Sequence, residues 1–254
     1  MVETRIHPGL PRLLVPPDDL VGRFVMNGEF ESRERDFVQR ILGAGDSFVD
    51  VGAHVGVYTI PAGHRVGDTG AVVAIEPHPD SFAVLVRNVA AHGLSRTVRC
   101  IQVAASDEDG TAEFHMPFPF QAAWSSLASP SVETARSAVV ATRTLDSLLG
   151  ELRPLLVKVD VEGWERHVLN GGRRLFGSAD APHLLFEVTD TAAAEDLAQL
   201  GYDLYRYEPR RIALDRISSN EYETGNVIAT KRVNELRQRL ARDGSSMVDP
   251  GPVA

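Results

Sequence analysis

The sequence predicts an α/β fold in which a mostly parallel sheet carries helices on both of its faces. Three apolar, β-branched runs, at 48–51, 71–76 and 155–160, have the composition of buried parallel strands, and a carboxylate stands at the end of each. Helical patterns follow these runs, and βαβ repetition gives parallel strands with right-handed crossovers. A glycine-containing turn follows the first run. These observations place several acidic strand ends at one edge of the sheet.

Length and composition limit the class of protein. A chain of 254 residues can bury one sizeable core, and its net charge of −9 argues against a nucleic-acid backbone as the main partner. The single cysteine, Cys100, excludes an internal disulfide, and no Cys/His spacing indicates zinc. The N-terminus lacks the build of a signal peptide, and no run approaches the roughly 20 apolar residues that span a bilayer. We expect a cytoplasmic protein without a membrane partner.

Residues 1–45 are predicted to form an N-terminal extension that covers one end of the domain. Strand-like pieces at 12–15 and 21–26 precede a turn at Asn27-Gly28 and a helix over 29–42. Glu29 and Glu31 fall in the first turn of that helix, where carboxylates suit the helix dipole. We interpret both as solvated residues rather than as catalytic ones.

Residues 46–232 are predicted to form the core. After the strand at 48–51, a helix is expected near 57–66, with a late start or a kink because Pro61 lies inside it. Further helices are expected at 81–92, 164–175 and 192–200. The remaining core strands are expected at 71–76, 98–103, 155–160, 184–188, 203–207 and 226–230, the last two closing the sheet as a hairpin with an antiparallel final strand.

Residues 111–147 interrupt this alternation as an insertion on the substrate side of the sheet. Strand-like runs at 111–116 and 138–144 flank Phe118, Phe120 and Trp124. Long loops at this edge form lids or substrate walls, although packing alone would also account for the aromatic side chains. Residues 233–254 are expected to form a short helix at 233–241 and then a disordered tail.

The turn after the first strand indicates the kind of ligand. A dinucleotide-binding turn reads G-x-G-x-x-G, whereas this chain has Gly52-x-x-x-Gly56 with Asp50 at the strand end. A carboxylate there repels a pyrophosphate and attracts a cation. S-adenosylmethionine, with its sulfonium and α-ammonium groups, therefore suits the turn better than NAD does. Alone, the pattern is also compatible with a simple strand exit.

A second strand ends in Glu76-Pro77. An acidic residue at the tip of the second strand can accept both ribose hydroxyls of a nucleoside, and Pro77 stops the strand because it has no N–H to donate. Two strands that are joined by a helix and that both end in a carboxylate strengthen the prediction of a nucleoside site.

The third charged strand end is Lys158-Val-Asp160-Val-Glu162. These three side chains project to one side of an extended chain, and Lys158 in an apolar run requires a nearby carboxylate. Asp160 or Glu162 can orient or deprotonate a substrate hydroxyl, stabilise a sulfonium, or serve as one oxygen ligand of a divalent metal. The alternative is a structural Lys158–Asp160 pair with Glu162 capping the next helix. Glu187, near the tip of the following strand, is a weaker candidate.

His54 is the histidine that we select for testing, because it lies inside the glycine turn and can face the cofactor or the substrate. We predict the catalytic set Asp160, Glu162, Lys158 and His54, and no dedicated metal site.

These motifs resemble the FkbM family of S-adenosylmethionine-dependent methyltransferases. The resemblance covers about residues 20–190, in order. Its motifs are Phe48-Val-Asp-Val-Gly-Ala-His-Val-Gly-Val-Tyr58, Ala74-Ile-Glu-Pro-His-Pro79, Leu85-Val-Arg-Asn88, Thr144-Leu-Asp146, Lys158-Val-Asp-Val-Glu-Gly-Trp-Glu165, Val168-Leu-Asn-Gly171 and Phe186-Glu187.

The resemblance implies a class I methyltransferase fold, which is a Rossmann-like, mostly parallel sheet. Asp50, Gly52 and Gly56 would line the methionine end, Glu76 would hold the ribose, and Ala105 and Ser106 would lie near the adenine. The remaining expected cofactor contacts are Ala53, His54, Tyr58, Pro77 and Asp160. His54 departs from the family pattern, which usually has Asn, and Trp164 stands where a small residue is usual.

The family also implies methylation of a hydroxyl on a small secondary metabolite such as a polyketide, a glycoside or a sugar, while some relatives act on carboxyl groups. An NAD-dependent oxidoreductase and a non-catalytic nucleoside-binding protein are the other readings. The absent G-x-G-x-x-G turn argues against the former. Whether the chain forms a homodimer stays open.

Overall fold

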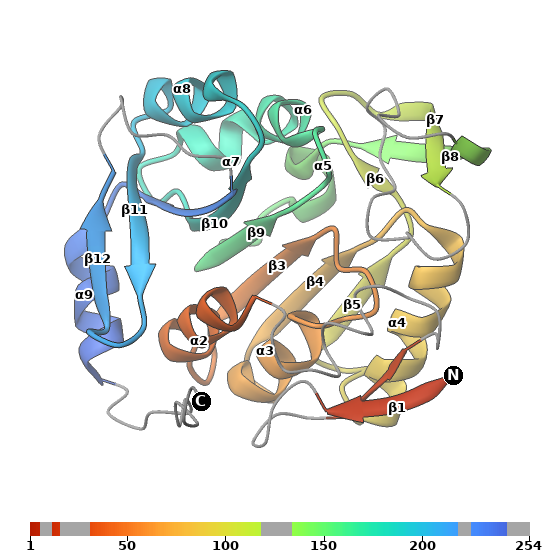
Figure 1. The fold of residues 1–254 in the computed structure, drawn as a ribbon, viewed down its shortest axis with the longest axis horizontal. Coiled ribbons are helices and arrows are strands. Elements are labelled where there is room, and N and C mark those ends of the chain that lie inside the picture. Colours follow the sequence, from red (N-terminus) through yellow and green to blue (C-terminus); the bar gives the residue numbers. More distant parts are fainter. Residues whose placement is uncertain (6–11, 16–30, 118–133, 218–224, 243–254) are drawn as a thin grey trace, which may run out of the picture.

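The computed structural model describes residues 1–5, 12–15, 31–117, 134–217 and 225–242 (Figure 1). The predicted strand at 21–26, the Asn27-Gly28 turn, the aromatic residues Phe118, Phe120 and Trp124, and the tail at 243–254 lie outside these ranges. In the part of the chain that is described, no helix is both long enough and apolar enough to cross a membrane.

The central sheet has eight strands in the order β12-β11-β13-β10-β9-β3-β4-β5. The five strands from β10 to β5 are parallel, while β13 is antiparallel to both of its neighbours. This topology confirms the predicted fold class, including the antiparallel final strand. The strands are β3 (Ser47–Val51), β4 (Ala71–Ile75), β5 (Val98–Ile101), β9 (Leu156–Val159), β10 (His183–Val188), β11 (Asp203–Glu208), β12 (Ala213–Arg216) and β13 (Gly225–Thr230).

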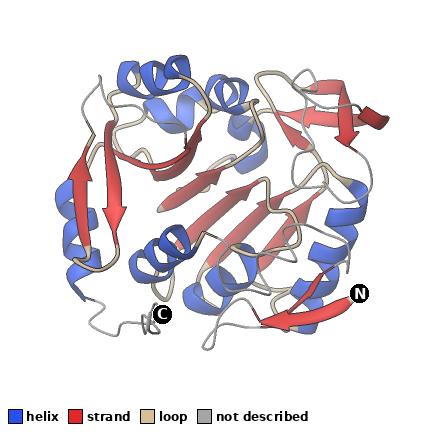
Figure 2. Cartoon of the chain, in the orientation of Figure 1, coloured by secondary structure: helices blue, strands red, loops and turns tan. Residues whose placement is uncertain are grey.

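Helices cover both faces of the sheet (Figure 2). One face packs against α2 (Ser32–Ile41), α3 (Thr59–Val66), α4 (Pro79–Ala91) and α9 (Val233–Arg242). The other packs against α5 (Leu145–Leu149), α6 (Glu165–Gly171), α7 (Arg173–Gly177) and α8 (Thr191–Gln199). Side chains alternate along each strand, so Phe48 belongs to the first core and Val49 to the second. Pro61 is tolerated because α3 begins at Thr59, which puts the proline in the first turn.

Two details of the core differ from the prediction. The single helix expected over 164–175 is two helices, α6 and α7, that meet at Gly171 and Gly172. A Cβ atom on Gly171 would lie 1.9 Å from the carbonyl oxygen of Ser106, so only glycine allows α6 to approach that segment. The two C-terminal strands do pair, but the unpredicted strand β12 lies between them in the chain and forms the edge of the sheet.

The insertion supplies two strands of a separate three-stranded sheet in the order β6-β8-β7, and the short strand β6 comes from the segment before the insertion. The strands of this sheet are β6 (Ala104–Ala105), β7 (Gly110–Pro117) and β8 (Thr134–Arg143). Phe114 of β7 contacts the ring of His78 with centroids 6.3 Å apart. The insertion therefore adjoins the segment that follows β4.

The side chain of Asn88 hydrogen-bonds to the N-terminal hairpin, which consists of β1 (Val2–Arg5) and β2 (Arg12–Val15). The backbone N–H of Leu14 donates to Oδ1 of Asn88 at 2.8 Å. Nδ2 of Asn88 in turn donates to the carbonyls of Leu14 and Val55, at 3.0 and 2.8 Å. Asn88 thus joins β2, α4 and the turn after β3.

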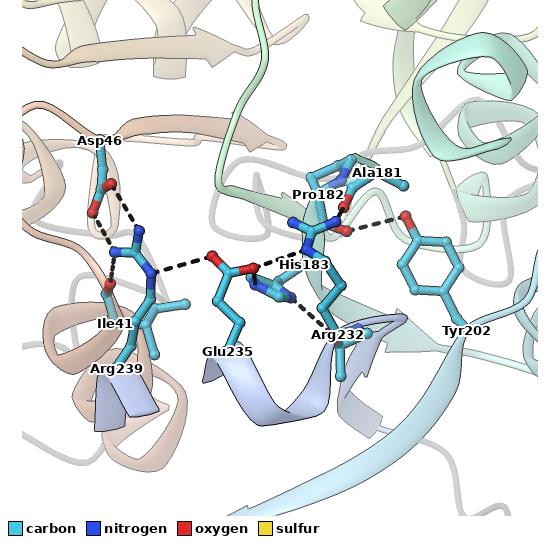
Figure 3. A network of polar contacts seen from close by, with 10 residues as sticks. Ile41, Asp46, Ala181, Pro182, His183, Tyr202, Arg232, Glu235 and Arg239 are labelled. Atoms are coloured by element: carbon cyan, nitrogen blue, oxygen red, sulfur yellow. Dashed lines mark hydrogen bonds and ion pairs between the residues drawn. The ribbon is translucent and has the colours of Figure 1, made fainter. Parts of the chain in front are cut away.

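A polar network fixes α9 at the amino end of the sheet (Figure 3). Arg239 donates to the carbonyl of Ile41 at 3.1 Å and pairs with Asp46 at 2.8 Å. Glu235 pairs with Arg232 at 2.8 Å and with Arg239 at 3.5 Å. Each arginine of the network therefore faces a carboxylate.

Candidate active site

The parallel strands bring the predicted acidic residues to one edge of the sheet. Asp50 of β3 lies opposite Lys158 of β9 in the pairing register, and Glu76 and Asp160 directly follow β4 and β9. Glu187 lies near the end of β10, the next strand along. Because the carboxyl ends of parallel strands share an edge, residues far apart in the sequence meet there.

Lys158 is buried and is surrounded by carboxylates. Its Nζ atom lies 2.8 Å from Oδ2 of Asp160 and 4.9 Å from the centroid of the Tyr58 ring. Burial lowers the pKa of Lys158, but the carboxylates of Asp160, Asp50 and Glu31 outweigh burial, so the pKa lies above its ordinary value. The ammonium group is therefore held in its charged form.

Asp160 is held in the complementary state. Burial raises the pKa of Asp160, but the charge and the hydrogen bond of Lys158 lower it by more than burial raises it. The pKa of Asp160 therefore lies below its ordinary value. The carboxylate is partly accessible, with a side-chain exposure of 22%. An ionised and reachable carboxylate can accept a proton from a substrate hydroxyl.

Asp50 is more deeply buried, at 1% exposure. Its Oδ2 accepts a hydrogen bond from the hydroxyl of Thr59 at 2.6 Å. Its Oδ1 is buried and finds no hydrogen-bond partner among the described residues. Burial raises the pKa of Asp50, against the opposing charge of Lys158. A buried carboxylate oxygen of this kind is incomplete without a donor.

The turn glycines meet protein rather than open space. Gly52 has a φ of +83°, and a Cβ atom there would lie 1.9 Å from the carbonyl oxygen of Asp160. The close neighbour of Gly52 is therefore the backbone that follows β9. Gly56, with a φ of +96°, packs against Leu85. Gly52 thus brings the ends of β3 and β9 together, and the side chain of Ala53 next to it is buried in the core.

Glu76 holds the backbone of the glycine turn and of the segment after β4. Its two carboxylate oxygens accept hydrogen bonds from the backbone N–H groups of His54 and His78, each at 2.8 Å. Burial raises the pKa of Glu76 to about 7, even though both hydrogen bonds favour the ionised form. Pro77 follows it as the strand stops. Each carboxylate oxygen retains a lone pair, so the group can still accept from a ligand hydroxyl.

His54 adopts a left-handed backbone conformation, with a φ of +50°. Asn and His are among the few non-glycine residues that tolerate this region. The departure from the usual Asn of the family therefore keeps the shape of the turn. The positive charge of a protonated His54 lowers the pKa of Asp160.

The expected adenine end is built around Ser106. Ala105 and Ser106 are both buried, at 4% and 3% exposure. The indole N–H of Trp164 donates to Oγ of Ser106 at 3.1 Å, and its ring stacks on His167 with centroids 3.5 Å apart. Trp164 therefore joins the start of α6 to the segment after β6.

The N-cap residue of α6 is Trp164, and its side chain makes no capping hydrogen bond. Glu165, the first residue of the helix, accepts instead from the backbone N–H groups of Val161 and Gly163 in the preceding turn, at 3.2 and 3.0 Å. The backbone of Glu162 is left-handed, with a φ of +53°. Burial raises the pKa of Glu162 to about 7, and the neighbouring Asp160 adds to the rise.

Glu187 completes a group of three carboxylates with Asp160 and Glu162. One oxygen from each lies within 4.8 Å of the others, a spacing that a divalent cation can bridge. Burial raises the pKa of Glu187 to about 9, with the charges of Asp160 and Glu162 adding to the effect. At neutral pH Glu187 is therefore protonated and can donate to Asp160.

The sequence interpretation of Glu31 is wrong, since this residue is not a solvated first-turn carboxylate. The hydroxyl of Tyr58 donates to its Oε2 at 2.7 Å, and Nδ2 of Asn226 donates to its Oε1 at 2.9 Å. Burial raises the pKa of Glu31, with Lys158 opposing and Asp160 adding to the rise. Neither Glu31 nor Asn226 was expected at the site, because both lie far from the strand-end motifs in the sequence.

Comparison with known proteins assigns the family. Residues 50–229 match the model of the methyltransferase FkbM domain, so the chain belongs to this methyltransferase family. It is 31% identical over 144 residues to the hexuronic acid methyltransferase AglP of Haloferax volcanii, a match that covers 54% of this chain and 56% of the relative.

Two solved structures are similar at lower identity. One is a methyltransferase FkbM from Methylobacillus flagellatus, with 17% identity, a TM-score of 0.49, and coverage of 73% of this chain and 44% of that one. The other is the fibrillarin of Aeropyrum pernix in complex with S-adenosylmethionine, with 12% identity, a TM-score of 0.46, and coverage of 75% and 68%. The chain spans about half the length of the curated relative and less than half of the FkbM structure.

Proposed function

We propose that the protein is an S-adenosylmethionine-dependent O-methyltransferase that acts on a hydroxyl of a small, sugar-like metabolite. Family membership supports methyl transfer. The observation that carries the choice of a hydroxyl is the ionised, partly accessible Asp160, which Lys158 holds 2.8 Å away at the edge where the glycine turn ends. The name of the relative, a hexuronic acid methyltransferase, supports a sugar-like acceptor.

The residues present fit the proposed cofactor. Oδ1 of Asp50 is buried and has no partner among the described residues, so it requires a donor such as the α-ammonium group. Glu76 has lone pairs left for ribose hydroxyls after accepting two backbone N–H groups. The turn that runs from Gly52 to Gly56, with Tyr58, Pro77, Ala105 and Ser106, would complete the contacts.

When bound, S-adenosylmethionine would supply an electrophilic methyl carbon whose bond to sulfur breaks as the bond to the acceptor oxygen forms. The carboxylate of Asp160 would orient the acceptor hydroxyl and take its proton. Lys158 keeps Asp160 ionised and fixes its position. Alignment and exclusion of water would supply most of the remaining rate enhancement.

Methyl transfer from CD3-labelled S-adenosylmethionine to a panel of acceptors tests this proposal. The panel contains glucuronic acid, a methyl glucuronide, neutral hexosides and a hydroxylated macrolide. We expect the label in an alkali-stable ether, with Asp160→Asn lowering kcat by roughly 10²–10⁴-fold. Glu108→Gln, at an exposed position in the turn before β7, is the matched control.

Carboxyl methylation is the second candidate, and the hexuronic acid named for the relative favours it, because a hexuronate carries a carboxylate. A label that alkali releases as methanol would show this reaction instead. Absence of S-adenosylhomocysteine binding by calorimetry would overturn both candidates. The cytoplasmic location and the homodimer stay predictions.

A further inference from the structure

A hydrogen bond between Thr59 and Asp50 spans the glycine turn. Asp50 lies near the end of β3, Thr59 is the first residue of α3, and Gly52 and Gly56 lie between them in the chain. The hydroxyl of Thr59 donates to Oδ2 of Asp50 at 2.6 Å, a distance typical of a hydroxyl that donates to a charged carboxylate. The bond therefore holds the strand and the helix on either side of the turn at a fixed separation.

The two partners of this hydrogen bond are shielded from water. Thr59 is 0% exposed and Asp50 is 1% exposed. A threonine hydroxyl in a helix can also bond to the carbonyl one turn earlier, which here belongs to Val55. That carbonyl accepts from Nδ2 of Asn88 at 2.8 Å. The hydroxyl of Thr59 is thus directed at the carboxylate rather than at its own helix.

One hydrogen bond at Oδ2 orients both oxygens of the Asp50 carboxylate. The carboxylate turns about the bond between Cβ and Cγ, a torsion that is broad and roughly two-fold when nothing restrains it. Once Thr59 holds Oδ2, the position of Oδ1 is set as well. Oδ1 is the buried oxygen that has no hydrogen-bond partner among the described residues. Thr59 therefore determines where this unfilled acceptor lies.

The cation opposite Asp50 does not fill that acceptor. Lys158 lies across from Asp50 in the register of β3 and β9, but its Nζ atom bonds to Oδ2 of Asp160 at 2.8 Å. Burial raises the pKa of Asp50, whereas the charge of Lys158 and the hydroxyl of Thr59 lower it. A buried carboxylate that is one donor short is a site for an ammonium group.

We propose that Thr59 is a positioning residue of the cofactor site, whose hydroxyl holds Oδ2 of Asp50 so that Oδ1 accepts a hydrogen bond from the α-ammonium group of S-adenosylmethionine. This role rests on the proposed function, because it takes the ligand of the site to be S-adenosylmethionine. The alternative is that Thr59 serves only the stability of the fold. The two roles differ in which ligands are weakened when the hydroxyl is lost.

Two ligands separate the positioning role from a structural one. S-adenosylhomocysteine carries the α-ammonium group, whereas 5′-methylthioadenosine has the same nucleoside and a thioether but no α-ammonium group. Thr59→Val keeps the branched shape of the side chain and removes the hydroxyl. In calorimetry we expect this variant to raise the Kd for S-adenosylhomocysteine roughly 5- to 30-fold and to leave the Kd for 5′-methylthioadenosine within about twofold of wild type.

A rescue variant and a matched control accompany this measurement. Thr59→Ser restores the hydroxyl, and we expect its affinity for S-adenosylhomocysteine to stay within about threefold of wild type. Thr230→Val is the control, because Thr230 is 1% exposed and its hydroxyl is hydrogen-bonded to Nδ1 of His183 at 2.7 Å, at the amino end of the sheet. The control should lower thermal stability without changing the affinity for either ligand.

A loss of affinity that is equal for both ligands in Thr59→Val, or no loss for either, would reject the positioning role. Should Thr59→Val not fold, Thr59→Cys takes its place, because a thiol is a weaker donor than a hydroxyl. We then expect a smaller loss that is still confined to S-adenosylhomocysteine, and equal effects on both ligands would again reject the role.

The inference and the proposed function fail separately. Wild-type protein that does not bind S-adenosylhomocysteine would overturn both. Wild-type protein that binds S-adenosylhomocysteine and transfers methyl groups, together with an unchanged affinity in Thr59→Val, would reject the role of Thr59 alone.

Discussion

At the amino end of the central sheet, each arginine of the α9 network faces a carboxylate, whereas at the carboxyl end one lysine is outnumbered by carboxylates. The pKa values follow this difference. Burial raises the pKa of Glu235 at the amino end, but Arg232, His183 and Arg239 lower it to below its ordinary value. At the carboxyl end, burial and neighbouring carboxylates raise the pKa of Glu187 to about 9.

The comparison teaches that similar charged residues serve two purposes in one fold. Paired charges fix α9 to the turn before β3, so removing either partner of an ion pair should lower the free energy of unfolding. Crowded carboxylates lower the stability of the folded protein, because each is forced close to others of the same sign. Such a cluster of carboxylates is tolerated where a ligand supplies the positive charge that the protein lacks. Carboxylates with perturbed pKa values are typical of functional sites.

The largest expected effect is on cofactor binding at the carboxyl end. Glu76→Gln removes the charge and one acceptor, and we expect the Kd for S-adenosylhomocysteine to rise roughly 10- to 100-fold. The substitution also leaves one of the N–H groups of His54 and His78 without its acceptor, so thermal stability is measured in parallel. Unchanged affinity in a folded variant would remove Glu76 from the cofactor site.

An intermediate effect is expected at the amino end. Arg239→Ala removes the ion pair with Asp46 and the hydrogen bond to the Ile41 carbonyl, and we expect a loss of about 1–3 kcal/mol in the free energy of unfolding. The exposed Arg237, on the same helix, provides the control Arg237→Ala. S-adenosylhomocysteine binding should not change in either variant. A matching loss of affinity in Arg239→Ala would show that the two ends of the sheet are coupled.

The third expected effect is a dependence of stability on pH. In the unfolded chain Glu187 ionises near its ordinary value of 4.5, whereas in the folded protein it keeps its proton to about pH 9. Between these values only the folded state binds the proton, so stability falls as the pH rises through this window. The slope is at most about 1.4 kcal/mol per pH unit, an upper bound because Glu187 is partly exposed.

Glu187→Gln keeps a donor toward Asp160 and removes the titration. Denaturant unfolding at pH 5 and pH 9 should show the variant gaining on the wild type as the pH rises, while Glu108→Gln follows the wild type. Parallel curves for Glu187→Gln and wild type would mean that the carboxyl end is less crowded than the structure indicates.

Most of the fold could be predicted from the sequence. The strands at 48–51, 71–76 and 184–188 were placed within one or two residues, because buried parallel strands are short apolar runs with sharp ends. The long helix over 164–175 was predicted wrongly. The helix is divided at Gly171 and Gly172, where the backbone of Ser106 approaches closely. The spacing of apolar residues along the sequence gives no sign of this contact.

The predicted site residues are brought together in part. Asp50, Glu76, Lys158 and Asp160 meet because strand ends share an edge, a consequence of topology that the βαβ pattern already implied. Their roles in binding and catalysis stay proposals. Glu165, rather than Glu162, accepts the backbone N–H groups of the turn after β9, and the backbone of Glu162 is left-handed, which helical spacing cannot reveal.

The sequence by itself determined the sheet, its acidic strand ends and the family, because local patterns of apolar, glycine and charged residues predict each of them. Only the tertiary structure decided that Glu31 joins them, since its contacts with Tyr58 and Asn226 connect segments far apart in the chain. Local spacing determines which side chains share a strand or a helix face. The total charge around a buried lysine comes from every segment that packs against it, so it is determined only once the chain is folded.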